Sequence, residues 1–170
     1  MSEAVIELRL AGSSDARPIA VMSRDFIETG LGWSYPPQRI AALLREPDTV
    51  CLIARHGGTL AGFGIMSFGD EHAHLVLLAV RPALRRRGVG RRVVEWLTQS
   101  TMTAGLVSVH VEMRAQNTDA QAFYRTLGFS ETLRLAGYYR GRETAIRMLR
   151  VLRTTAVTPM PWRPPTLDPR

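Results

Sequence analysis

The stretch VRPALRRRGVGRR at residues 80–92 decides the fold and carries the strongest functional signal of the chain. It follows an apolar run over residues 75–80 that predicts a buried strand, and it leads into a helical pattern that begins at Val89. Gly88 and Gly90 allow the backbone to approach a ligand closely and to adopt φ values that other residues avoid. The first turn of the helix points unpaired N–H groups at that ligand, with the positive end of the helix dipole behind them. The order of strand, glycine turn and helix therefore predicts a site for a phosphate or pyrophosphate.

The glycine spacing excludes two familiar phosphate motifs. There is no Gly-x-x-x-x-Gly-Lys-[Ser/Thr] P-loop, and the dinucleotide pattern Gly-x-Gly-x-x-Gly fails because Val93 stands where the third glycine belongs. The spacing that remains is Arg85-x-x-Gly88-x-Gly90. It resembles the [Gln/Arg]-x-x-Gly-x-[Gly/Ala] signature of the GNAT superfamily of N-acetyltransferases, in which this turn holds the pyrophosphate of coenzyme A. Taken alone, the motif leaves two alternatives open: a solvated arginine-rich turn and a nucleic-acid patch.

Composition narrows the class of protein. The 170 residues suit one domain with a substantial core. All 22 basic residues are arginine and the net charge is +7, which favours anionic partners and excludes a catalytic lysine. The single Cys51 excludes an internal disulfide, and we expect no metal site because His72 and His74 lack further metal-ligating residues in sequence. No apolar run is long enough for a membrane span and the N-terminus does not resemble a signal peptide, so we expect a cytoplasmic protein.

Hydrophobic periodicity predicts an α/β fold with the element order β-α-α-β-β-β-α-β-α-β-β. That order implies a mixed, mostly antiparallel sheet with helices on both faces. It is also the order of the GNAT fold, whose sheet splays at the cofactor site. We expect strands over 5–10, 49–55, 59–67, 72–80, 106–113, 129–136 and 144–152, and helices near 19–26, over 37–45, from the glycine turn to about 103, and over 117–127. The acetyltransferase domain would cover residues 1–153, followed by a proline-rich tail over 154–170 that is disordered or loosely docked.

A second signature supports the same family. Asn117 stands at a predicted helix start, Tyr124 follows seven residues later, and Leu-Gly-Phe ends the segment at residues 127–129. Within the family, the chain is most similar to ribosomal-protein-alanine and related protein N-terminal acetyltransferases, on VEMR at 111–114, the two tyrosines at 138–139 and RETAIRM at 142–148. Thr144 replaces the acid that those enzymes carry, and the region before residue 60 shows no clear match.

The resemblance implies that acetyl passes directly from acetyl-CoA to an amine. Glu112 would act as the general base, directly or through a water, and Tyr124 as the acid that protonates the departing thiolate. On the residues alone, Glu112 is equally an ordinary solvent-facing glutamate, and Tyr124 lies on the apolar stripe of its helix, where it packs as core. A phenol has an unperturbed pKa of about 10, so it holds a proton to donate at neutral pH.

The remaining site residues divide between cofactor and acceptor. Asn117 is predicted either to cap its helix or to contact the pantetheine arm, and a capping box of Thr118 with Gln121 would free it for that contact. The acceptor would meet aromatic side chains that equally suit a core staple or a turn: Trp33, Tyr35, Tyr138 and Tyr139. The cofactor would lie against Leu78, Ala79, Val80, Arg85, Arg86, Arg87, Gly88, Val89, Gly90, Arg91, Asn117 and Tyr124.

Four functions remain to be separated. The leading one is an acetyl-CoA-dependent N-acetyltransferase, monomeric or homodimeric, whose acceptor is a protein or peptide N-terminus. An alternative in the same class acts on a small amine, such as an amino acid, a polyamine or an aminoglycoside; a cationic acceptor would call for acids such as Asp25 and Glu28, or Asp70 and Glu71. A non-catalytic acyl-CoA sensor is a third possibility. A nucleic-acid-binding module is the fourth, but it does not account for Asn117 and Tyr124, so we expect no specific nucleic acid partner.

Overall fold

The computed structural model describes residues 5–153, and the predicted proline-rich tail therefore lies outside the described residues. Seven strands form one sheet in the order β1-β2-β3-β4-β5-β7-β6. Among the strands of the described residues only the β4–β5 pair is parallel, so the mixed, mostly antiparallel sheet and the predicted element order are confirmed. The elements are β1 (Ile6–Leu10), α1 (Ala16–Phe26), α2 (Pro37–Leu43), β2 (Thr49–His56), β3 (Thr59–Phe68), β4 (His72–Val80), α3 (Val89–Thr103), β5 (Ser108–Arg114), α4 (Thr118–Thr126), β6 (Ser130–Tyr139) and β7 (Glu143–Val151), with short 3₁₀ turns at Ser13–Asp15 and Pro82–Leu84.

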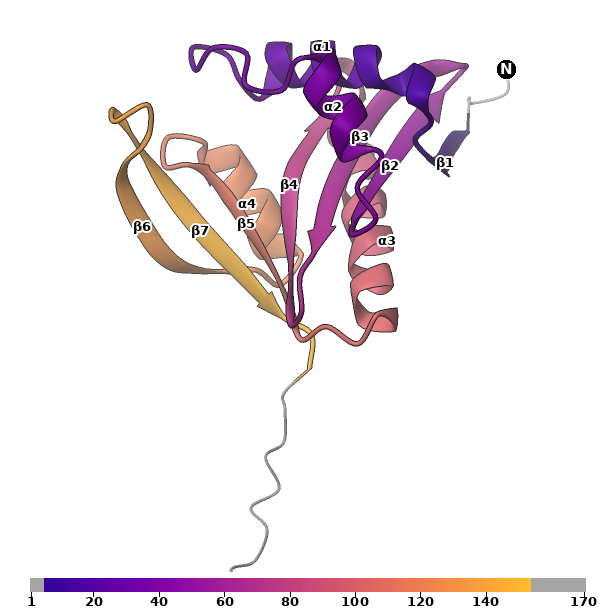
Figure 1. The fold of residues 1–170 in the computed structure, drawn as a ribbon. Coiled ribbons are helices and arrows are strands. Elements are labelled where there is room, and N and C mark those ends of the chain that lie inside the picture. Colours follow the sequence, from indigo (N-terminus) through magenta and orange to yellow (C-terminus); the bar gives the residue numbers. More distant parts are fainter. Residues whose placement is uncertain (1–4, 154–170) are drawn as a thin grey trace, which may run out of the picture.

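Helices cover both faces of the sheet, as the sequence predicts (Figure 1). Helices α1 and α2 pack on one face, around the fully buried Ile19 and Ile40. Helices α3 and α4 pack on the other, around Val93, Leu97 and Tyr124. Two layers of apolar side chains therefore hold the sheet from either side. Within the described residues, no helix is both long and apolar enough to cross a membrane.

A β-bulge in β4 changes which face its side chains occupy. Leu75 pairs with Met66 and Leu77 with Ile65, so Val76 is an extra residue without a partner on β3. Side chains alternate along a strand, and one inserted residue exchanges the two faces. Leu75 accordingly packs in the core beneath α3 and α4, whereas Leu77 packs in the core beneath α1 and α2.

The sheet opens immediately after this bulge. The parallel ladder between β4 and β5 runs from His72↔Ser108 to Leu75↔Val111 and stops there. Beyond that point the two strands diverge, which is visible as a V in Figure 1. Strand β4 keeps its β3 partner as far as Val80, and β5 keeps its β7 partner as far as Arg114. One side of the second half of β4 is therefore left without a strand partner, which confirms the expected splay.

One local expectation differs from the structure. Tyr138 and Tyr139 are the last residues of β6 rather than part of a turn, because the β6–β7 pairing continues to Tyr139↔Glu143. The longer strand brings the Tyr138 hydroxyl into hydrogen-bonding reach of Glu112 on β5.

Candidate active site

The unpartnered side of β4 forms one wall of the candidate site. Backbone groups of Leu78 and Ala79 lie in this stretch, where the pairing with β5 has ended. An extended chain with amide groups can hydrogen-bond such an edge as an added strand does. The carbonyl of Val80 is already used, because Nε of Arg85 donates to it at 3.0 Å. The predicted cofactor contact of Leu78 and Ala79 stays a prediction, and one hydrogen bond of the Val80 carbonyl is already made within the protein.

The turn before α3 presents a row of free amides. Gly88 has φ +78° and precedes the helix as its N-cap, and Arg86 adopts φ +60°. The first backbone bond of the helix runs from Arg92 to the Gly88 carbonyl, and within the described residues no acceptor is bonded to the amides of residues 86–91. Amides at a helix N-terminus, backed by the helix dipole, are suited to hold an anion. Open space lies where a Cβ of Gly88 would point.

Gly90 and Arg85 differ in detail from the expectation. A Cβ at Gly90 would sit 3.2 Å from the Phe123 ring, so this glycine serves the packing of α3 against α4. The guanidinium of Arg85 turns back over the Phe26 ring at 5.8 Å. The exposed side chains of Arg86, Arg87 and Arg91 keep the turn positive.

Tyr124 lies behind this wall, near the splay. Its ring is buried and packs edge-to-face against Phe123 and Phe129, with centroids 5.1 and 5.3 Å apart. Burial raises the pKa of Tyr124 above its ordinary value, so the phenol keeps its proton at neutral pH. Its hydroxyl bonds to no protein group in the described part of the chain, and it is not among the atoms sealed from solvent without a partner. The ring is thus core while the hydroxyl stays available.

Asn117 caps α4, and the capping-box alternative is wrong. Its Oδ1 accepts the Ala120 amide at 3.1 Å. Gln121 cannot reach back to the helix start because its Nε2 donates to the Ala115 carbonyl at 2.8 Å. The side chain of Asn117 is exposed, so its amide nitrogen still faces solvent for a ligand contact.

Glu112 is held by two partners from neighbouring strands. It is register partner to Arg147 on β7, whose guanidinium donates to Oε1 in an ion pair, and the Tyr138 hydroxyl donates to Oε2. Burial alone would raise the pKa of Glu112, but the bonds from Tyr138 and Arg147 outweigh burial and lower it. Only 8% of the Glu112 side chain is exposed. The carboxylate is therefore ionised at neutral pH, and a weaker base than a free glutamate.

Two histidines lie beside Glu112 on the same face of the sheet. His74 and His110 are register partners whose rings stack with centroids 4.5 Å apart. Burial, the neighbouring imidazole and Arg147 lower the pKa of His110 to about 4, and burial lowers that of His74. Both rings are neutral at physiological pH. His110 and Arg147 were not among the predicted site residues, although strict alternation in β5 puts His110 on the same face as Glu112.

A loop between α1 and α2 carries the two predicted acceptor aromatics. Trp33 is 40% exposed and donates to the Ala20 carbonyl at 3.2 Å, while Tyr35 is half-buried against the core beneath α1. The loop is tied down by Glu28, whose carboxylate accepts from the amides of residues 34 and 35 and from the Ser23 hydroxyl at 3.0 Å. Trp33 is thus tied to α1 and Tyr35 to the core, and both side chains are only partly buried; their contact with an acceptor stays a prediction.

The two tyrosines at the end of β6 differ in exposure and in hydrogen bonding. Tyr138 is 49% exposed, but its hydroxyl is engaged with Glu112. Tyr139 is half-buried and its ring stands perpendicular to that of Tyr138, with centroids 5.0 Å apart. The hydrogen bond to Glu112 raises the pKa of Tyr138 to about 12, and burial raises that of Tyr139 to about 12. Both phenols stay protonated at neutral pH.

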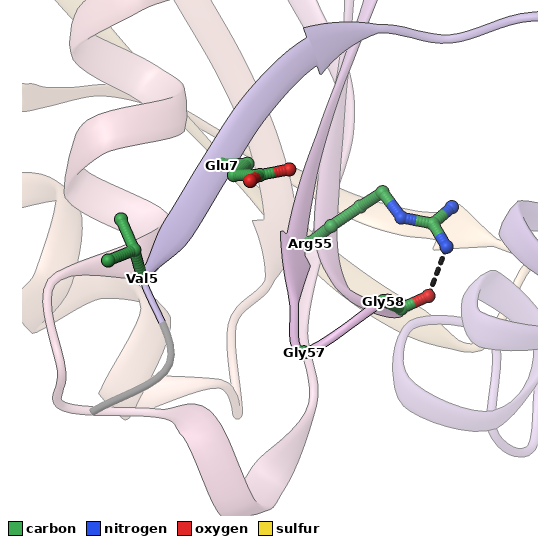
Figure 2. A pocket seen from close by; sticks show the side chains of 5 residues that line it. All are labelled: Val5, Glu7, Arg55, Gly57 and Gly58. Carbon is green, nitrogen blue, oxygen red and sulfur yellow. Dashed lines mark hydrogen bonds between the residues drawn. The ribbon is translucent and has the colours of Figure 1, made fainter. Parts of the chain in front are cut away.

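Two surface pockets lie outside this constellation. One lies at the β1 edge of the sheet, where Arg55 bonds to the Gly58 carbonyl next to Glu7 (Figure 2). The other lies along α1 and reaches Arg81. Neither contains Glu112 or Tyr124.

Comparison with known proteins accords with this geometry. The sequence model of the acetyltransferase (GNAT) family matches residues 20–129. The [ribosomal protein bS18]-alanine N-acetyltransferase of Salmonella typhimurium is 39% identical over 92 residues, which are 52% of this chain and 62% of that protein. The N-alpha-acetyltransferase RimI of Mycobacterium tuberculosis is 35% identical over 112 residues, or 62% of this chain and 68% of that protein. The crystal structure of Ard1 from Thermoplasma volcanium superposes with a TM-score of 0.77 at 26% identity, covering 88% of this chain and 99% of that chain.

Proposed function

Since this chain belongs to the acetyltransferase (GNAT) family, we propose that it transfers the acetyl group of acetyl-CoA to the amino terminus of a protein or peptide. The observation that carries the proposal is the splay between β4 and β5, with free amides of the α3 turn at one end and Glu112 and Tyr124 beside it. Two relatives whose names state N-terminal or ribosomal-protein alanine acetylation support the choice of acceptor. The match spans 62% of the length of the first of them, so the acceptor is part of the proposal.

The cosubstrate fits the backbone features of the site. The amides of residues 87–91 would hold its pyrophosphate, because they are unbonded and lie at a helix N-terminus. The exposed edge at Leu78 and Ala79 would pair with the pantetheine amides. The thioester would then point through the splay toward the hydroxyl of Tyr124.

The proposed reaction is a direct transfer. The amine nitrogen attacks the thioester carbon, the C–S bond breaks, the amine loses one proton, and the sulfur gains one. The chain has one cysteine, Cys51, and burial raises the pKa of its thiol to about 12, so it is not a nucleophile for an acyl-enzyme step.

Tyr124 is the proposed acid. Its high pKa keeps the phenol protonated, so it donates to the sulfur as negative charge develops there. Glu112 is the proposed base, and its low pKa favours a role through a water rather than full removal of the proton in one step. A peptide α-amine has an unperturbed pKa of about 7.7–8.0, so a useful fraction is already neutral at physiological pH.

A cytoplasmic site of action belongs to the same proposal, since the Salmonella relative is named for a ribosomal protein acceptor. We assign the activity to the domain over residues 1–153, working as a monomer or homodimer without nucleic acid or membrane. An assay of the free thiol of coenzyme A, which acetyl transfer releases, tests the proposal. The acceptors compared are peptides with free N-termini and small amines. We expect release with peptides that begin with Ala or Ser. Release with polyamines, aminoglycosides or amino acids alone would contradict it.

A further inference from the structure

The tip of the β6–β7 hairpin faces the loop between α1 and α2. Nη2 of Arg114 donates to the Thr29 carbonyl at 2.5 Å, which ties that loop to the end of β5. The guanidinium of Arg140 fills the space that a Cβ of Gly32 would occupy. These two contacts hold the loop against the hairpin tip, and Tyr138 of the same hairpin bonds to Glu112; we call the surface formed by Tyr35, Tyr138 and Arg140 the acceptor mouth.

The carboxylates around the acceptor mouth are already engaged. Glu112 pairs with Arg147, and Glu143 lies 3.4 Å from Arg114. Glu28 accepts hydrogen bonds from the amides of its own loop, and Asp25 pairs with Arg24 at 2.9 Å. The other acids that the sequence suggested for a cationic acceptor, at residues 70 and 71, lie in the β3–β4 turn, before the start of β4. The acids near the loop and the hairpin tip therefore already have partners within the described residues.

The arginines of the hairpin tip, in contrast, have no acidic partner among the described residues. Arg140 and Arg142 are exposed, and within residues 5–153 neither side chain forms an ion pair or a hydrogen bond. Arg140 also adopts φ +51°, a left-handed conformation that residues with a Cβ rarely adopt. Glycines occupy other left-handed positions of the same hairpin, at 137 and 141. At this left-handed turn position the chain therefore carries an exposed guanidinium in place of a glycine.

We propose that the acceptor carries a carboxylate close to its reacting amine, and that Arg140, supported by Arg142, is the residue that selects it. The inference rests on the proposed function and narrows its substrate class to acidic N-terminal peptides. Tyr138 reaches Glu112, and Arg140 follows two residues later along the hairpin. Arg140 and Arg142 follow directly after the strand end that reaches Glu112, so an acceptor whose amine lies near Glu112 would bring its next residues toward these guanidinium groups. A guanidinium holds a carboxylate through two parallel hydrogen bonds.

The test compares three matched peptides that begin with Ala and differ at positions 2 and 3, which are Glu, Gln or Lys. We expect the kcat/KM of the wild-type protein to be higher for the Glu peptide than for the Gln peptide by roughly fivefold at low salt, with the Lys peptide lowest. The Glu preference should shrink at high ionic strength because exposed charges are screened. Arg140→Glu should reverse the order of the Glu and Lys peptides.

Arg134→Gln is the matched control, because this exposed β6 arginine is paired with Glu131 and lies away from the tip. It should keep the wild-type preference. A wild-type ratio of one or below, or the same ratio in Arg140→Glu, would overturn the inference. A free carboxylate-bearing amine, glutamate, forms a separate arm: preference for it over every peptide would assign the carboxylate to a small acceptor instead.

Measurements of peptide binding test this inference independently of the proposed reaction. Titration calorimetry of the three peptides in the presence of coenzyme A measures acceptor affinity without turnover. Activity on no peptide, with tighter binding of the Glu peptide that Arg140→Glu abolishes, would contradict the proposed reaction and uphold the carboxylate selection. Turnover of all three peptides at equal rates and with equal affinities would uphold the proposed reaction and contradict the carboxylate selection.

Discussion

At the scale of single residues, a substitution at Tyr124 distinguishes its proposed chemical role from its role in packing. Its ring belongs to the core and its hydroxyl makes no hydrogen bond within the described residues, so Tyr124→Phe removes the proposed acid and keeps the packing. We expect kcat to fall by about 10²-fold, with little change in the dissociation constant of acetyl-CoA or in the melting temperature. Steady-state kinetics and calorimetry on the same sample measure both. A variant with wild-type kcat would show that Tyr124 serves the core alone.

The proposed role of Glu112 predicts how the reaction rate depends on pH. Its lowered pKa keeps the carboxylate ionised well below neutrality, so the change of rate near pH 7–8 should follow the acceptor amine. Glu112→Gln should therefore lose most activity below neutral pH, where the amine is protonated, and recover in part at high pH. The exposed Glu131 on β6 supplies the control variant Glu131→Gln. An equal loss at every pH would assign Glu112 to positioning the acceptor.

The residues that sequence reasoning found and missed differ in kind. Tyr124 and Asn117 were identified because the family signature is local and continuous. Arg147, in contrast, meets Glu112 only through the β5–β7 register, which brings together residues 35 positions apart. Tyr138 was expected to contact the acceptor, and its bond to Glu112 depends on how far β6 extends. Contacts of this kind depend on the pairing of strands that are far apart in sequence, so no local sequence pattern predicts them.

At the scale of elements, the β4–α3 turn should bind the cosubstrate. Gly88→Asp would place a carboxylate against the phosphates, and it should remove the rise in melting temperature that acetyl-CoA gives the wild-type protein. Gly105 follows the other end of α3 with φ +85° and open space around it, so Gly105→Asp introduces a comparable backbone strain as a control. An undiminished shift in Gly88→Asp would exclude this turn as the pyrophosphate site.

The order of elements was predictable and the bulge in β4 was not. Alternation and glycine turns define most strands, and β4 was predicted with its observed bounds. Residues 75–80 are all apolar, however, so they give no periodicity from which an inserted residue at Val76 can be read. The bulge becomes visible only in the pairing with β3.

At the scale of the whole molecule, the stacked histidines make stability depend on pH. Their pKa values are lowered in the folded state, His110 to about 4 from an ordinary value near 6.5. The unfolded chain therefore binds more protons below pH 6.5, and stability should fall as the pH drops from 6.5 toward 4. His110→Gln should flatten this decline in melting temperature by calorimetry, whereas the matched His56→Gln should not. A decline of unchanged slope in His110→Gln would assign the acid sensitivity to other groups.

The position of the acetyl group on a product peptide tests the central claim most directly. A peptide that begins with Ala and contains an internal lysine is incubated with acetyl-CoA and the protein, and fragment masses then locate the modification. The account predicts one acetyl group on the α-amine, none on the lysine, and none on the same peptide with a blocked N-terminus. Acetylation confined to the lysine, or transfer to small amines with every peptide left unmodified, would contradict it.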